Sequence, residues 1–217
     1  MGREFIEIFE GWAADYDKSV AGEDPQYAAV FHRYDEILQE VADRVKGTVL
    51  EFGTGTGNLA KKMMEVGHEV IGIEPSHSMR TIARGKFPNL TVLDGDFLTF
   101  PDIGKPVDTV ASSYAFHHLS KDEKEKAVQQ FGRMLPPGGR IIFADTMFRS
   151  EEEHDQAVKD ARSRGFAALA NDLEREFYPY TGDIKELFEK NGWKTRLERM
   201  NDFVWLLEAV KEQIGAD

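Results

Sequence analysis

The sequence predicts a doubly wound α/β fold, built on a mostly parallel seven-stranded sheet with one antiparallel strand near the C-terminus. In its central part, short apolar runs alternate with amphipathic helical patterns, which is typical of βαβ crossovers and of a sheet covered on both faces. Two strand-like runs near 193–200 and 203–210 are separated only by Asn201-Asp202 and predict a terminal hairpin. We expect a single structural domain, with an N-terminal helical cap over residues 1–46 and the main body over residues 47–217.

The cap is predicted from apolar residues at helical spacing on both sides of a break. Trp12 belongs to the first pattern, and the acidic, glycine-containing segment 22–25 interrupts it. The second pattern runs from Tyr27 to Val45 and ends at Gly47. The aromatic residues of the two patterns form a stripe, which either packs against the sheet as core or covers a ligand site.

The body is predicted from the order of its strands and helices. The first five strands are expected at 48–52, 69–73, 90–93, 107–111 and 140–144, with helices near 58–66, 76–86 and 121–135 between them. Helices near 150–175 and 182–191 precede the terminal hairpin.

Composition and charge exclude several classes of protein. The absence of cysteine excludes disulfides, iron–sulfur clusters, zinc–thiolate sites and a thiol nucleophile. A formal net charge of -12 argues against a nucleic-acid partner, which needs a basic surface. No apolar run approaches the ~18 residues of a membrane span, and the N-terminus lacks the regions of a signal peptide. We therefore expect a cytoplasmic protein, a monomer or homodimer, with no membrane partner.

The most informative segment is the turn after the first strand, where Gly53, Gly55 and Gly57 lead directly into a helix. Glycine lets the backbone turn sharply and lets a ligand approach the main chain, while the helix start offers free N–H groups to an anion. A turn without a ligand would need only one glycine. The spacing therefore favours a ligand-binding loop.

Two cofactors fit this loop. Residues 55–60 satisfy the dinucleotide pattern G-x-G-x-x-G/A, and Glu74, at the end of the next strand, is suited to bind a ribose diol of either cofactor. Against a nicotinamide cofactor, the chain lacks the downstream Tyr-x-x-x-Lys pair and a second substrate domain. An NAD(P)-dependent reductase nevertheless stays an alternative.

With Glu51 included, the loop reads E-x-G-x-G-x-G, which resembles motif I of the class I S-adenosylmethionine-dependent methyltransferases. Further segments resemble the same family in the same order: Glu74, then Asp94-Gly95-Asp96-Phe97, then the turn Leu135–Arg140. The resemblance covers about residues 45–148, and the whole chain, including segment 9–17, resembles the small bacterial YrrT-type methyltransferases.

The resemblance implies a Rossmann-like fold, S-adenosyl-L-methionine as cofactor and a set of residues that bind it. Asp96 would meet the adenine amino group, Phe97 would close over the ring, and Tyr16 on a closing cap would lie near the methionine moiety. The full set of implied cofactor-binding residues is Glu51, Gly53, Gly55, Gly57, Glu74, Asp96, Phe97 and Tyr16.

Candidate catalytic residues follow the fourth strand, where His117 and His118 lie in a loop at the carboxyl edge of the sheet. His117 is the candidate general base, whereas His118 is expected to pack beneath the loop. Phe177, Tyr178 and Tyr180 are candidates for the acceptor pocket. We expect no metal site, because adjacent histidines rarely chelate one ion and the other four lie on unrelated elements.

Together these features predict an S-adenosylmethionine-dependent methyltransferase that acts on a small-molecule acceptor. Besides the reductase, the alternative is a protein that binds S-adenosylmethionine without turnover. The acceptor itself is not encoded in any motif.

Overall fold

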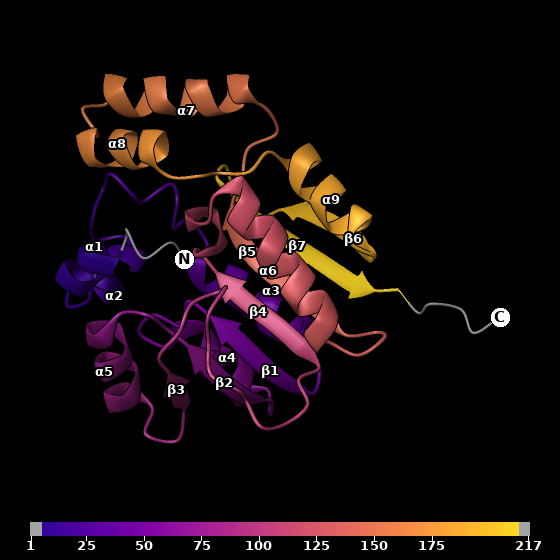
Figure 1. Cartoon of the computed structure of the whole chain (residues 1–217). Coiled ribbons are helices and arrows are strands. Elements are labelled where there is room, and N and C mark those ends of the chain that lie inside the picture. Colours follow the sequence, from indigo (N-terminus) through magenta and orange to yellow (C-terminus); the bar gives the residue numbers. More distant parts are fainter. Residues whose placement is uncertain (1–5, 213–217) are drawn as a thin grey trace.

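A seven-stranded sheet forms the centre of the computed structural model, which describes residues 6–212 (Figure 1). The strand order is β3-β2-β1-β4-β5-β7-β6, and β7 runs antiparallel to both of its neighbours, which confirms the predicted topology. The strands are β1 (Thr48–Phe52), β2 (Glu69–Ile73), β3 (Thr91–Leu93), β4 (Thr109–Ser113), β5 (Arg140–Thr146), β6 (Trp193–Arg199) and β7 (Val204–Lys211).

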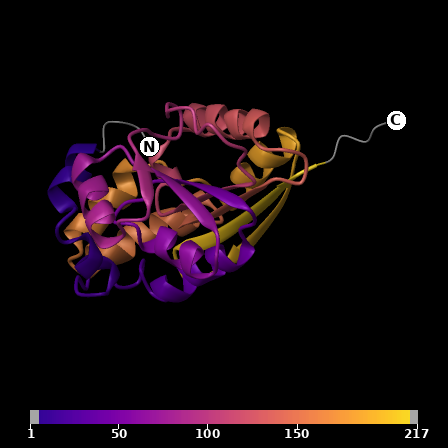
Figure 2. The same ribbon diagram turned by 90° about the horizontal axis from the view of Figure 1, so that it is seen from below.

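Helices cover both faces of this sheet, as Figure 2 shows along its edge. Helices α3 (Tyr34–Arg44), α4 (Asn58–Glu65) and α5 (His77–Lys86) pack on one face through buried aliphatic side chains. Helices α6 (Lys121–Met134) and α9 (Thr181–Lys190) cover the other, where Phe52, Phe131 and Phe188 contribute to the core. Because both faces are covered, the strands are apolar along most of their length.

Strand pairing determines where the loops meet. β1 pairs with both β2 and β4, in register from Val49↔Thr109 to Phe52↔Ser112. From β1 the chain continues through β2 and β3 on one side and then returns to β4 and β5 on the other side of β1. The loops after β1 and β4 therefore turn in opposite directions and open a crevice at the carboxyl edge. The glycine loop and the short helix η2 (Phe116–His118) lie at this edge.

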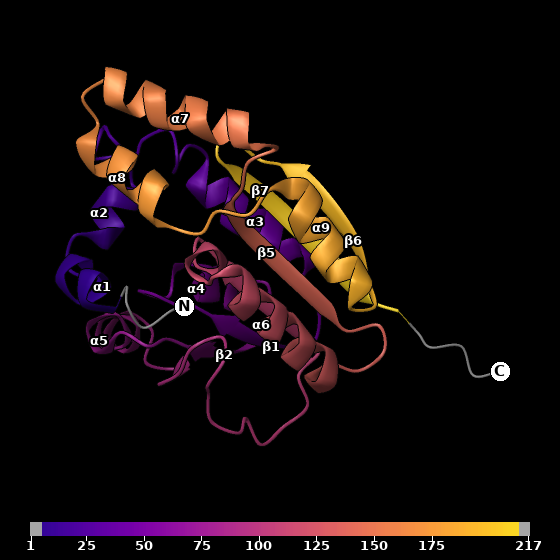
Figure 3. The same cartoon turned by 45° about the horizontal axis from the view of Figure 1, so that its top comes forward.

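Four further helices lie over the carboxyl edge. Helices α1 (Ile6–Trp12) and α2 (Tyr16–Val20) come from the N-terminus, and α7 (Glu151–Ser163) and α8 (Ala167–Arg175) follow β5. One cluster of buried residues, which includes Val20 of α2 and Leu173 of α8, joins these elements, and Figure 3 shows the two helices near each other.

The cap differs from its prediction in two respects. The second helix begins only at Tyr34, because Arg33 adopts a left-handed conformation (φ 63) and the preceding residues form turns. Helix α3 then packs against the sheet with Ile37 and Val41 fully buried, so only the segment before it lies over the carboxyl edge. Residues 1–5 of the predicted cap lie outside the described residues.

The helix expected over 150–175 is also divided. Gly165, with φ 74, ends the first part, and α8 begins at Ala167. This break turns α8 back against the N-terminal segment, as the hydrogen bond from Ala168 N to Gln26 Oε1 (3.0 Å) shows.

Candidate functional site

The three glycines of the loop after β1 are required for two different reasons. All three have a positive φ, which favours glycine. A Cβ at Gly53 would lie 2.5 Å from the Cβ of Ala115, and one at Gly57 would lie 2.8 Å from the Phe87 ring. At Gly55 a Cβ would meet only the Gly53 carbonyl, at 3.9 Å. Gly53 and Gly57 are therefore required by close packing, whereas Gly55 leaves space for a ligand.

The space beside this loop is a cavity of about 350 Å³, within the usual range for small-molecule sites. One end is lined by Gly53, Gly55 and Glu74, which are three of the predicted cofactor-binding residues. The other end is lined by the histidine pair and by the C-terminal end of α8. The cavity thus joins the cofactor end to a second compartment.

Glu74 forms the floor of the cofactor end. Its carboxylate is 3 % exposed, and it accepts hydrogen bonds from the backbone N–H groups of Gly55 and Ser76, both at 2.8 Å. Burial raises the pKa of Glu74 to about 7, against the effect of those hydrogen bonds. Each carboxylate oxygen retains a lone pair for a further donor, such as a ribose hydroxyl.

Glu51 lies beneath the loop and does not line the cavity. It is 1 % exposed, and its Oε2 has no hydrogen-bond partner among the described residues. Burial, together with the nearby charge of Glu74, raises the pKa of Glu51 to about 8. Its predicted role in cofactor binding is therefore indirect in this arrangement.

The segment after β3 fits its prediction less well. The Asp96 carboxylate accepts hydrogen bonds from the backbone N–H groups of Leu98 (2.9 Å) and Thr99 (2.8 Å), and thus holds a turn. The Phe97 ring is 1 % exposed and stacks on Phe52, with centroids 5.0 Å apart. That ring belongs to the core and does not line the cavity, so the structure gives its predicted contact with adenine no support. The roles of Phe97 and Asp96 in cofactor binding stay predictions.

The N-terminal segment covers the cofactor end with aromatic rings. Tyr16 and Trp12 line the cavity and pack edge to face, with centroids 5.2 Å apart. Burial raises the pKa of Tyr16 well above its usual value, so its hydroxyl stays protonated. Tyr16 thus lines the same cavity as Gly53, Gly55 and Glu74, and its contact with the methionine moiety stays a prediction.

Two carboxylates attach this segment to the body. Asp17 accepts hydrogen bonds from Thr56 Oγ1 (2.6 Å) in the glycine loop and from Lys86 Nζ (2.8 Å). Glu10 accepts from the backbone N–H groups of His77 and Ser78 at the start of α5, where the helix dipole favours negative charge. Opening the segment would break both attachments.

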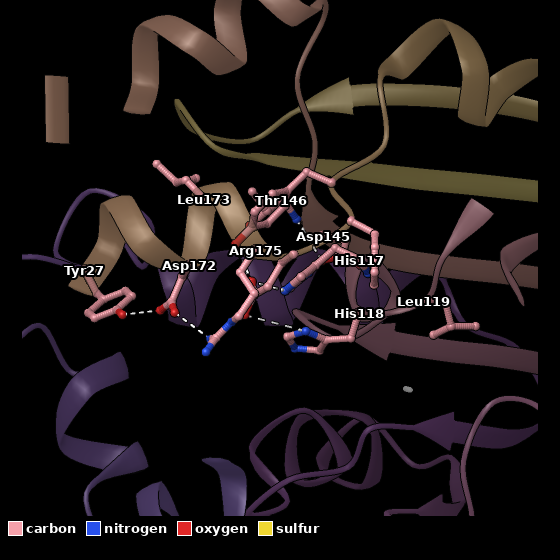
Figure 4. Close-up of polar contacts among 12 residues, drawn as sticks. Tyr27, His117, His118, Leu119, Asp145, Thr146, Asp172, Leu173 and Arg175 are labelled. Carbon is pink, nitrogen blue, oxygen red and sulfur yellow. Dashed lines mark hydrogen bonds and ion pairs between the residues drawn. The ribbon is translucent and has the colours of Figure 1, made fainter. Parts of the chain in front are cut away.

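At the other end, His117 is held between two carboxylates (Figure 4). Its Nδ1 contacts Asp145 Oδ1, its backbone N–H donates to Asp145 Oδ2 (2.8 Å), and its Nε2 lies 3.3 Å from Glu176 Oε2. Burial alone favours the neutral ring, but the two carboxylates raise the pKa of His117 to about 9. A ring that keeps its proton at neutral pH is not a resting general base, so a catalytic part for His117 requires that something displace the proton.

Of the other candidates for the acceptor pocket, some line the cavity and others do not. His118 is 3 % exposed and lines the cavity, and Tyr178 lines it while stacking on His117. Phe177 is 42 % exposed and, like Tyr180, does not line this cavity.

Three charged residues at this end were not predicted: Asp172 and Glu176 line the cavity, and Asp145 contacts His117 without lining it. Asp145 ends β5, and Asp172 and Glu176 belong to α8 or follow it directly. Asp172 accepts a hydrogen bond from the Tyr27 hydroxyl and lies 2.7 Å from Arg175. Only Asp145 could have been recognised from the sequence. It follows an apolar strand run, and a charged residue buried in a strand requires a partner.

Comparisons with known proteins identify the family of this chain. A family model described as a methyltransferase domain matches residues 49–139. The chain is 52% identical to an uncharacterized methyltransferase of Oceanobacillus iheyensis, over 97% of this chain and 99% of that protein. It is 50% identical to the uncharacterized methyltransferase YrrT of Bacillus subtilis, over 97% of this chain and 100% of that one.

Solved structures share the fold at low identity. Magnesium protoporphyrin IX methyltransferase from Synechocystis PCC 6803, with bound SAH (S-adenosylhomocysteine), has a TM-score of 0.74 at 16% identity, and the alignment covers 98% of this chain and 100% of that one. A possible histamine N-methyltransferase from Thermotoga maritima has a TM-score of 0.70 at 19% identity, covering 95% and 99%. Within residues 6–212, no helix has the length and apolar character needed to span a membrane.

Proposed function

This chain belongs to the YrrT-type class I methyltransferases, and from that premise we propose that it transfers the methyl group of S-adenosylmethionine to a small-molecule acceptor. The observation that carries the proposal is that the glycine loop and Glu74 line one covered cavity together with several aromatic side chains. S-adenosylmethionine, when bound, supplies the reactive sulfonium methyl, and the protein has to orient the acceptor and exclude water.

The residues at the cofactor end fit such a group. Gly55 contributes a surface that a Cβ would fill, and Glu74 offers carboxylate oxygens to a diol. Tyr16 and Trp12 present aromatic faces, which suit a sulfonium cation. We therefore assign Gly53, Gly55, Glu74 and Tyr16 to direct contact, and Glu51, Gly57 and Asp96 to support of the loops.

A small acceptor is favoured by the cover over the cavity. Helices α1, α2 and α8 lie over the carboxyl edge. The Tyr27 hydroxyl, in the N-terminal segment, donates a hydrogen bond to the Asp172 carboxylate of α8. A macromolecular acceptor would have to displace these elements. His117, at the acceptor end, stays the catalytic candidate. Cytoplasmic location and a monomeric or homodimeric state remain predictions from the sequence.

Calorimetry with S-adenosylhomocysteine tests the cofactor assignment. We expect binding, and we expect Glu74→Gln to weaken it about 10- to 100-fold, because a hydrogen bond to a charged group contributes about 1.5–3 kcal/mol. Glu69→Gln is the matched control, since Glu69 starts the same strand but is exposed and pairs with Lys105. Binding of NADH instead of S-adenosylhomocysteine would favour the reductase and contradict the proposal.

A further inference from the structure

Three side chains that commonly bind metals converge at the acceptor end of the cavity. One potential ligand atom from each of His117, His118 and Glu176 lies within 4.8 Å of the other two. All three side chains line the cavity and at least nine-tenths of the surface of each is buried. The sequence brings only the two histidines together, which is why it predicted no metal site; Glu176 joins them from the end of α8.

The surroundings of these residues orient them as ligands. Asp145 contacts Nδ1 of His117, which leaves Nε2 directed toward Glu176. The Tyr178 hydroxyl donates to Glu176 Oε2 and fixes that carboxylate. A carboxylate on the far nitrogen of a histidine, with a further hydrogen bond on a ligating carboxylate, is the usual outer shell of a metal site.

The distances are close to those of a bound ion. Tetrahedral ligands at about 2.0–2.2 Å from zinc lie about 3.4 Å from one another. His117 Nε2 is 3.3 Å from Glu176 Oε2, and His118 Nδ1 is 3.8 Å from Glu176 Oε1. All three ligand atoms lie within 4.8 Å of one another, so binding of one ion would draw them closer together.

Charge also balances in this arrangement. Asp145 and Glu176, which both contact His117, supply two negative charges, and these match a divalent ion that takes the place of the His117 proton. The nearby cation Arg175 is closer to Asp172 (2.7 Å) than to Glu176 (3.7 Å). It therefore has a partner of its own outside the ligand set.

We propose that His117 Nε2, His118 Nδ1 and the Glu176 carboxylate bind a divalent transition-metal ion of the zinc type. Two imidazoles and one carboxylate are a donor set typical of such ions, and the side toward the cavity leaves a position open. In the proposed function, on which this role rests, the open position takes the acceptor's sulfur, nitrogen or oxygen atom. A bound ion would lower the pKa of that group, so that the group would release its proton to solvent before the covered site excludes water.

Titration of the purified, chelator-treated full chain with Co²⁺ tests this site, because Co²⁺ absorbs visible light strongly when it is four-coordinate. We expect a visible band that saturates at one ion per chain and that Zn²⁺ abolishes by competition. Asp145→Asn should keep the band but weaken affinity about 10- to 100-fold, as outer-shell changes do. His118→Ala and Glu176→Gln should weaken it more, whereas His32→Gln, at an exposed histidine that does not line the cavity, should not.

Circular dichroism and S-adenosylhomocysteine binding on the same samples show whether each variant is folded. No visible band, or a band that Glu176→Gln leaves unchanged in affinity, would overturn the metal site. If S-adenosylhomocysteine binds in that case, the proposed function stands without the ion. If Co²⁺ binds as expected but S-adenosylhomocysteine does not, the metal site stands and the proposed function fails.

Discussion

Glu51 and Glu74 end neighbouring parallel strands beneath the glycine loop, and both are buried. Burial raises the pKa of Glu51 to about 8 and that of Glu74 to about 7. Ionisation of these buried carboxyl groups lowers the stability of the folded chain. Buried carboxyl groups with raised pKa values are typical of ligand-binding and catalytic sites.

The stability of the ligand-free protein should therefore depend on Glu51. Its folded-state pKa lies above the usual 4.5, so the folded chain binds more protons than the unfolded chain between those values. Stability accordingly falls as pH rises from about 4.5 to about 8. The Glu51→Gln variant has no carboxyl group to ionise at this position. The difference between its melting temperature and that of the wild type should therefore increase as the pH rises through this range. Glu186→Gln, at an exposed position on α9, controls for the lost carboxylate; a Glu51→Gln difference that is flat with pH would contradict this account.

Gly55 provides a second prediction for a single residue. Gly55→Ala should weaken S-adenosylhomocysteine binding by more than tenfold, because the added methyl group enters the cavity. Gly104→Ala is a matched control, since Gly104 also has a positive φ (69) but its Cβ would meet nothing within 4 Å. Equal affinity in the two variants would show that the loop does not contact the ligand.

At the scale of elements, segment 6–20 is held over the glycine loop by Asp17 and Glu10. Asp17 joins α2 to Thr56, Asn58 and Lys86, so it connects the cover directly to the loop beneath it. Covers over active sites are drawn from the less stable parts of a structure.

Asp17→Ala should loosen this cover. Amide hydrogen exchange over residues 12–20 should become faster in the ligand-free protein, while exchange in β1 and β4 should not change. S-adenosylhomocysteine should restore part of the protection. Asp15→Ala is the control, because Asp15 pairs only with the exposed Lys18 among the ion pairs of this segment. If exchange over 12–20 is already as slow as in the sheet and Asp17→Ala leaves it so, the segment is a fixed part of the core.

The sequence allowed prediction of these elements where the hydrophobic period is unambiguous. All seven strands and the helices between β1 and β5 lie within a few residues of their predicted positions. The helix from Tyr27 was mispredicted because its aromatic residues keep helical spacing through a segment that Arg33 bends. At the site, local motifs located Gly55, Glu74 and His117, but Asp172 and Glu176 carry no motif and reach the cavity only through tertiary packing.

At the scale of the whole molecule, the carboxyl edge of one sheet collects the glycine loop, the histidine pair and the covering helices around one cavity. The fold and the family account for the cofactor end, where the strand order opens a crevice. The other end of the cavity combines His117 and His118, which follow β4, with residues of the N-terminal segment and of α8.

The most direct test of the account is methyl transfer from radiolabelled S-adenosylmethionine in a bacterial extract separated into low-molecular-weight and macromolecular fractions. We predict that the purified chain labels a compound of the low-molecular-weight fraction, and that Glu74→Gln lowers the rate at limiting cofactor while Glu69→Gln does not. Label only in protein or nucleic acid, or no label in any fraction while S-adenosylhomocysteine still binds, would contradict the central claim of a methyltransferase that acts on small molecules.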